Sequence, residues 1–176
     1  MPKNIAAIPE VIHDFNLYLT GNRLAGITGD VALPSLEGTT EEVSGVGILG
    51  SYESVVPGIY KSMEQEIPFR CLNEDYFKLV DTTQPLELTL RGAIQNKVKS
   101  TGAVDYIGLR VVFRGVPKKM ELGTVKQAGP MDSKISLETT YLLVEYDGFK
   151  KLELDKINGI FIVNGKDVLQ KVHKLT

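Results

Sequence analysis

The chain has 176 residues, of which 43% are hydrophobic and 24% charged, and its formal net charge is −2. This composition predicts one globular domain, and the slightly acidic balance excludes a protein that holds nucleic acid through many phosphate contacts. One cysteine and two histidines exclude a disulfide framework and a zinc site built from several cysteines, so we expect no metal and no cofactor.

The N-terminal part of the chain predicts a short β-hairpin. Residues 15–19 and 23–27 are strand-like, and the Thr-Gly-Asn sequence at 20–22 between them is a turn signal. The first ten residues carry one basic side chain, and Pro9 interrupts an apolar stretch that is too short for a signal peptide. No run of about 18 apolar residues occurs, so we expect no membrane-spanning helix.

Residues 35–58 lack the periodicity of a strand or a helix. The segment contains several glycines and Pro57, and a connection of this length in a compact domain is generally functional or disordered when free. It also carries apolar side chains that an isolated surface loop would leave in water: Val46, Ile48, Leu49, Tyr52, Val55 and Val56. We therefore predict an irregular loop that is mobile in the free chain and becomes ordered against a partner.

The middle of the chain predicts a strand followed by a helix. Residues 67–70 alternate apolar and polar side chains, and Cys71 follows them directly. We expect Cys71 to be buried in a strand rather than to act as a nucleophile, because no histidine lies near it in the sequence. Residues 73–80 give the best helix signal, with Asn73 as the N-cap and two acidic residues in the first turn.

The second half of the chain predicts mostly strands. Residues 85–91, 106–114 and 133–145 alternate at period two, as half-buried strands do. The Asp-Gly pair at 147–148 separates two strand-like runs and predicts a tight hairpin. Apolar spacing over residues 166–175 predicts a second short helix.

None of the motifs predicts an active site. Gly45, Gly47 and Gly50 match the spacing of a dinucleotide-binding loop, but no buried strand is predicted before them and no helix after them. Arg110 and Arg114 share one face of a predicted strand and could bind phosphate, although the polar faces of strands commonly carry such residues. We therefore expect that the protein is not an enzyme.

Several short motifs follow one another over nearly the whole chain: Phe15-Asn16-Leu17-Tyr18-Leu19, Arg23-Leu24-Ala25-Gly26, Val31-Ala32-Leu33-Pro34, Glu41-Glu42 with Gly45-Val46-Gly47-Ile48, Leu90-Arg91-Gly92-Ala93-Ile94-Gln95, Arg110-Val111-Val112-Phe113-Arg114-Gly115, and Asn164-Gly165-Lys166-Asp167-Val168-Leu169. In this order and spacing they resemble the major tail tube proteins of contractile-tailed bacteriophages, a family shared with R-type bacteriocins.

The resemblance implies a mainly β fold, a β-sandwich or partly open barrel with one flanking short α-helix. It implies a single domain over residues 1–176, with an N-terminal arm (1–14), a long inter-subunit loop (35–58) and a C-terminal arm (157–176). In that loop, which is expected to reach a neighbouring ring, the implied stacking residues are Glu41, Glu42, Val46, Ile48, Leu49 and Tyr52.

The resemblance also implies a structural function. Such subunits assemble as hexameric rings that stack into a hollow tube inside a contractile sheath, and in a phage DNA passes through the tube into the host. The implied partners are further copies of the chain and the tail sheath, baseplate and tail terminator proteins, with DNA only in transit and no stable membrane binding. The protein is expected in the host cytoplasm during assembly and in the virion tail afterwards.

The distribution of charge predicts an acidic lumen in such a tube. Residues 1–60 hold 2 basic and 7 acidic side chains. Because every bound phosphate would slow the passage of DNA, an acidic and weakly adhesive bore suits a conduit. The candidate lumen residues are Glu37, Glu53, Glu64 and Glu66, together with Glu41 and Glu42 of the loop.

Two alternatives remain open at this point. The same tube geometry serves a contractile bacteriocin or another injection machine, so the sequence does not separate these from a phage tail. A small-ligand-binding β-barrel would instead be a stable monomer with a closed apolar cavity. Electron microscopy separates the two classes, because only a tube protein forms rings or tubes.

Overall fold

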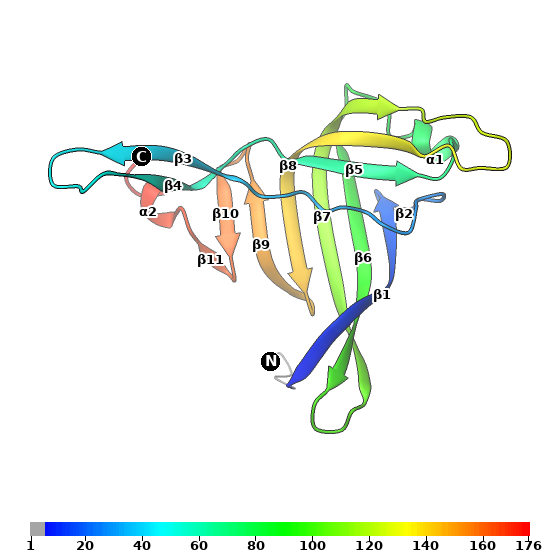
Figure 1. Cartoon of the computed structure of the whole chain (residues 1–176), viewed down its shortest axis with the longest axis horizontal. Coiled ribbons are helices and arrows are strands. Elements are labelled where there is room, and N and C mark those ends of the chain that lie inside the picture. The colour runs from blue at the N-terminus through cyan, green and yellow to red at the C-terminus, as the bar shows by residue number, and fades with distance from the viewer. Residues whose placement is uncertain (1–5) are drawn as a thin grey trace.

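The computed structural model describes residues 6–176 and is built mainly from antiparallel β-strands (Figure 1), which confirms the predicted fold class. In chain order its elements are β1 (Ala7–Leu19), β2 (Asn22–Arg23), β3 (Gly38–Ser44), β4 (Ser51–Tyr60), β5 (Glu64–Phe69), α1 (Glu74–Phe77), β6 (Leu86–Val98), β7 (Val104–Glu121), β8 (Ser133–Tyr146), β9 (Phe149–Asp155), β10 (Ile160–Val163), β11 (Lys166–Asp167) and α2 (Gln170–His173).

One long antiparallel sheet runs in the order β11-β10-β9-β8-β7-β6-β1-β2. The sheet divides at β8, because residues 133–138 pair with β5 whereas residues 141–146 pair with β9. β5, the first half of β8 and the end of β7 that pairs with it thereby form a second layer, to which α1 adds the buried side chain of Tyr76. The strands that the structure describes do not close into a barrel, so the sandwich is partly open.

The hydrophobic core lies between the long sheet and the second layer. Leu88 of β6 and Phe113 of β7 are direct cross-strand partners, and both are fully buried. One face of each strand packs in this core, and the other carries mainly polar or partly exposed side chains apart from the buried Val112. The strands therefore show the period-two alternation from which they were predicted. Other buried core side chains come from both layers: Leu17, Ile67, Phe69, Tyr76, Leu79, Leu90, Val111, Ile135, Leu137 and Leu142.

Helix α1 begins where the sequence predicts it. The Asn73 side-chain oxygen accepts a hydrogen bond from the backbone N–H of Tyr76 at 2.8 Å, which caps the helix. The Asn73 Nδ2 group also donates to the carbonyl oxygen of Ala25 at 2.9 Å. One side chain therefore caps α1 and ties it to the segment that follows β2.

We expect Asn73→Ala to lower the free energy of unfolding by about 1–2 kcal/mol, because it removes the N-cap and the donor to Ala25. Asn73→Asp is the matched control, since it keeps the capping acceptor and loses only the amide donor. Urea denaturation of both variants measures the losses, and the free energy of unfolding should fall clearly less for Asn73→Asp than for Asn73→Ala. Equal losses for the two variants would show that the cap contributes little.

Residues 38–60 differ from the predicted irregular loop. They form a two-stranded hairpin, β3–β4, which pairs with no other strand in the part of the chain that the structure describes. Period-two alternation marks a strand in a sequence only where one face is buried. In β4 every second residue from Ser54 to Tyr60 is half-buried, but the exposed positions between them are Val55, Pro57 and Ile59. The sequence therefore shows no alternation of apolar and polar residues there.

Cys71 also lies differently from its prediction. It is exposed in a bend after β5, because β5 ends at Phe69 and the chain then turns toward α1. The terminal segments have regular structure of their own: residues 7–14 form the first half of β1, and residues 157–176 contain β10, β11 and α2. α2 is shorter than the helix predicted there.

Candidate functional site

The β3–β4 hairpin projects from the rest of the fold. In Figure 1 it extends sideways past β11 and α2, at the end of the long sheet opposite to β1. At its tip, residues 45–50, the side chains of Val46 and Leu49 lie entirely in solvent, and Ile48 and the adjacent Tyr52 are also exposed. A two-stranded hairpin is marginally stable by itself in water, so this one has the shape of a segment that contacts another surface.

The tip glycines form a turn and no nucleotide site. Gly45, Gly47 and Gly50 all have positive φ, a conformation that favours glycine. They lie between two paired strands rather than between a strand and a helix. The glycine spacing therefore reflects the geometry of the hairpin.

Three carboxylates on the hairpin form no ion pair with any residue in the described range 6–176: Glu41, Glu42 and Glu53. Glu42 and Glu53 lie directly opposite one another in the ladder, an arrangement that is unfavourable for like charges. A partner surface with basic or hydrogen-bonding groups would relieve this repulsion.

The base of the hairpin is anchored to the sheet. Tyr60 packs edge to face against Phe161 of β10, with the ring centroids 5.3 Å apart. Gly58 has a positive φ, which favours glycine, and its missing side chain leaves room for Leu169, whose methyl carbon would lie 2.8 Å from a Cβ there. The hairpin thus has a fixed base and a free tip.

The other acidic candidates are neutralised. Glu37, Glu64 and Glu66 each lie beside a lysine; for example, the Lys118 ammonium is 2.6 Å from a Glu64 oxygen. The hydrogen bond from Lys118 lowers the pKa of the Glu64 carboxyl. The structure therefore brings Glu41, Glu42 and Glu53 together on the hairpin and places Glu64 and Glu66 apart from them, on β5 of the second layer.

The long sheet has an open edge along β1. This strand pairs with β6 along its length, whereas β2 covers its other edge only at Tyr18 and Leu19. Ile8, Val11 and Ile12 on the uncovered part are each about half exposed. A long edge with apolar side chains is a template for pairing with a strand of another chain.

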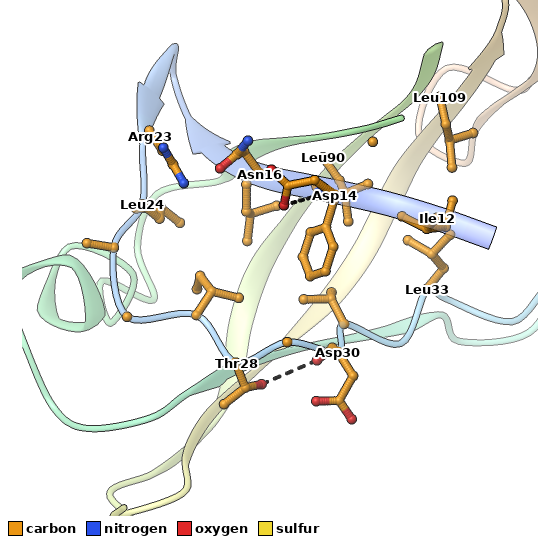
Figure 2. A pocket seen from close by; sticks show the side chains of 18 of the residues that line it. Ile12, Asp14, Asn16, Arg23, Leu24, Thr28, Asp30, Leu33, Leu90 and Leu109 are labelled. Carbon is orange, nitrogen blue, oxygen red and sulfur yellow. Dashed lines mark hydrogen bonds between the residues drawn. The ribbon is translucent and has the colours of Figure 1, made fainter. Parts of the chain in front are cut away.

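A groove of about 930 Å³ lies between β1 and residues 24–33 (Figure 2). Its lining is mixed: Phe15, Leu17, Leu90 and Leu109 are apolar, and polar residues such as Asp14 lie among them. Ile12 and Leu33 lie together at one end of it and remain 48% and 46% exposed. The groove is open to solvent, unlike the closed cavity that a ligand-binding barrel would need.

The face of the long sheet that lies away from the second layer carries paired charges. Arg110 donates to Glu145 at 2.9 Å, and Arg114 donates to Glu87 at 2.8 Å. The Arg114 guanidinium also lies over the ring of Tyr141, 5.0 Å from its centroid. The arginine pair that the sequence left open to phosphate is thus neutralised by carboxylates.

Burial, together with a hydrogen bond to Glu153, raises the pKa of Tyr141 from 10.0 to about 12. The folded state holds the Tyr141 hydroxyl proton more tightly than the unfolded state. This proton therefore stabilises the folded state fully below pH 10, and that contribution is lost as the pH rises through about 12. We expect an ultraviolet titration of the native protein to show a late tyrosinate step that Tyr141→Phe removes. The exposed Tyr52→Phe variant is the control and should retain that step.

The sequence did not identify the groove or the free edge of β1. A signal was available, because Val11 and Ile12 are adjacent in a strand and cannot both point into one core. Among residues 6–176 no helix could cross a membrane, and no three metal-ligating side chains cluster. Apolar side chains are exposed, among other places, at the hairpin tip, along the edge of β1 and at the rim of the groove.

Residues 9–175 match the family described as "Phage tail tube protein FII". The "Tail tube protein" of Escherichia phage P2 is 29% identical over 166 residues, which cover 94% of this chain and 95% of that protein. In structure the chain is similar to the sheath/tube terminator of an extracellular contractile injection system, PVC, solved by cryo-electron microscopy in the extended state. The TM-score is 0.52 at 12% sequence identity, over 78% of this chain and 96% of that chain, which supports the fold.

Proposed function

Because the chain belongs to the phage tail tube protein FII family, we propose that it is the structural subunit of the inner tube of a contractile phage tail. Copies form hexameric rings, and the rings stack into a hollow conduit inside the contractile sheath. Baseplate and tail terminator proteins contact the two ends of the tube, and DNA crosses the bore only in transit. The subunit is made and assembled in the host cytoplasm, binds no membrane stably and acts by assembly alone, without catalysis.

The observation that carries this proposal is the open edge of β1. Pairing of residues 7–17 with the opposite end of the sheet in another copy would satisfy free backbone groups and cover the apolar side chains of the edge. The two ends of the sheet are different surfaces, so the contact is heterologous and generates a ring when the rotation between copies closes.

The layers of the fold suggest which face lines the bore. α1, β5 and the anchored base of the hairpin all pack on one face of the long sheet. In a cylinder of edge-joined sheets this bulky layer has more room outside than inside. The bore is then lined by the opposite face, where Arg110 and Arg114 are neutralised by Glu145 and Glu87 and cannot hold passing phosphates strongly.

That the lumen is acidic remains a prediction. In this arrangement the carboxylates that would line it differ from the candidates chosen from the sequence. Glu64 and Glu66 lie on the second layer, so the charge of the bore depends on the face that carries Glu87, Glu145 and Glu153. The carboxylates of the hairpin then contact a neighbouring subunit. A map of the assembled tube with the second layer turned inward would contradict this assignment.

Size-exclusion chromatography with light scattering, followed by negative-stain microscopy, tests the proposed function. The purified full chain should form rings or tubes at high concentration or after seeding with tail baseplates. A strict monomer under every condition contradicts the proposal and favours a ligand-binding protein. Detection of the chain in DNA-filled particles separates a phage tail from the tube of an injection machine.

A further inference from the structure

We propose that the tip of the β3–β4 hairpin of one copy occupies the groove between β1 and residues 24–33 of the adjacent copy in the ring. This inference rests on the proposed function, because it requires copies that join at the ends of their sheets. It places the tip contact within a ring, whereas the sequence alone placed it between rings.

The hairpin tip and the rim of the groove both expose apolar side chains to water. At the tip, Val46 and Leu49 have relative exposures of 109% and 107%, so no part of the same subunit covers them. The groove has both apolar and polar lining residues, and its apolar rim residues Ile12 and Leu33 are half exposed. Inserting the tip would remove the apolar side chains of both surfaces from water at once.

A subunit cannot fill its own groove with its own tip. The hairpin projects beyond the β10–β11 end of the long sheet, whereas the groove lies at the β1 end (Figure 1). Packing of Tyr60 on Phe161 and of Leu169 on Gly58 fixes the base of the hairpin at its own end. The occupant must therefore come from a second copy.

The tip and the groove lie on the same face of the sheet. Leu17 and Leu90, which line the groove, pair directly across the ladder. The same cross-strand row continues through Val111 and Val144 to Leu152, which packs in the cluster at the base of the hairpin. Direct cross-strand partners point to the same side of a sheet, so this row defines one continuous face.

The geometry of edge pairing then brings the two surfaces together. When the β10–β11 end of one copy meets the β1 edge of the next, the shared face continues across the junction. A hairpin that projects past the first copy on that face extends over the second copy at its β1 end, where the groove opens. Each copy gives one tip and receives one, as a closed heterologous ring requires.

Disulfide cross-linking tests this contact. The exposed Cys71 is first changed to Ser, and Leu49→Cys is combined with Leu33→Cys. After assembly and mild oxidation, we expect a non-reducing gel to show a ladder of covalent oligomers that ends at the ring size. Variants with Leu49→Cys or Leu33→Cys alone should give dimers at most.

Two outcomes overturn the proposal while leaving the tube function standing. One is a ladder that continues past the ring size, which shows contacts between rings. The other is efficient cross-linking of Leu49→Cys to Val125→Cys, an 86% exposed position outside the groove, with none to Leu33→Cys. If the Cys71→Ser parent forms no rings or tubes under any condition, the proposed function fails and this inference fails with it.

A charge-pair experiment covers the case in which the cysteine pair impairs assembly. Leu49→Asp alone and Leu33→Lys alone are expected to reduce tube yield at least tenfold, because each puts a charge into an apolar contact. The double variant should recover most of that yield, since the two charges would then meet in the groove. Failure of the double variant to recover any yield, with no cross-link between the cysteine pair, overturns the proposal.

Discussion

Replacement of residues 45–50 by Asn-Gly is expected to abolish tube formation and to leave cooperative melting of the free subunit intact. Ser44 and Ser51 are cross-strand partners, so a two-residue type I′ turn joins them without changing the register of the hairpin. The replacement removes Val46 and Leu49, which contact nothing within the subunit. Calorimetry measures the melting, and negative-stain microscopy with baseplate seeds measures assembly.

A second variant separates the apolar contact from the length of the loop. Val46→Ser with Leu49→Ser keeps every glycine of the tip and should also prevent assembly. Amide exchange provides an independent signal, because hairpin backbone should exchange rapidly in the free subunit and slowly in the tube. Normal polymerisation of either variant, or slow exchange already in the monomer, would show that the hairpin is ordinary scaffold.

The strands of the core could be predicted from the sequence because each buries one face. β6, β7 and β8 each place alternate side chains in the core between the two layers, and the alternation appears directly in the chain. The Asp-Gly turn before β9 was equally predictable, since Asp147 and Gly148 both adopt the positive φ that such a turn requires. At these positions the residue types and their spacing were enough to predict the local structure.

The hairpin and the groove could not be predicted in this way. No strand of the hairpin has a fully buried face, and apolar residues of β4 such as Val55 and Val56 lie on both faces, so no apolar–polar alternation marks them. The groove joins β1 to residues 24–33, which have little regular structure, and its shape depends on the path of that segment. Cys71 was misplaced for a related reason, because the alternating run before it ends where the chain turns toward α1.

Phe113→Ala is expected to lower the free energy of unfolding of the subunit by about 3–5 kcal/mol. Phe113 is fully buried, and its direct partners on the two sides are Leu88 and Leu142, which are also buried. Truncation leaves a cavity at the centre of the sheet, where the partner strands cannot collapse without breaking their ladders. Urea denaturation of the purified subunit measures the loss.

Phe149→Ala is the matched control, because Phe149 is 44% exposed at the start of β9. The same truncation there should change the free energy of unfolding by about 0.5 kcal/mol or less. Tubes bind only folded subunits, so seeding Phe113→Ala with baseplates should raise its melting temperature above that of the free variant. Equal losses for the two phenylalanines would contradict a core centred on Phe113. If Phe113→Ala melts at the same temperature with and without baseplate seeds, folding is not coupled to assembly.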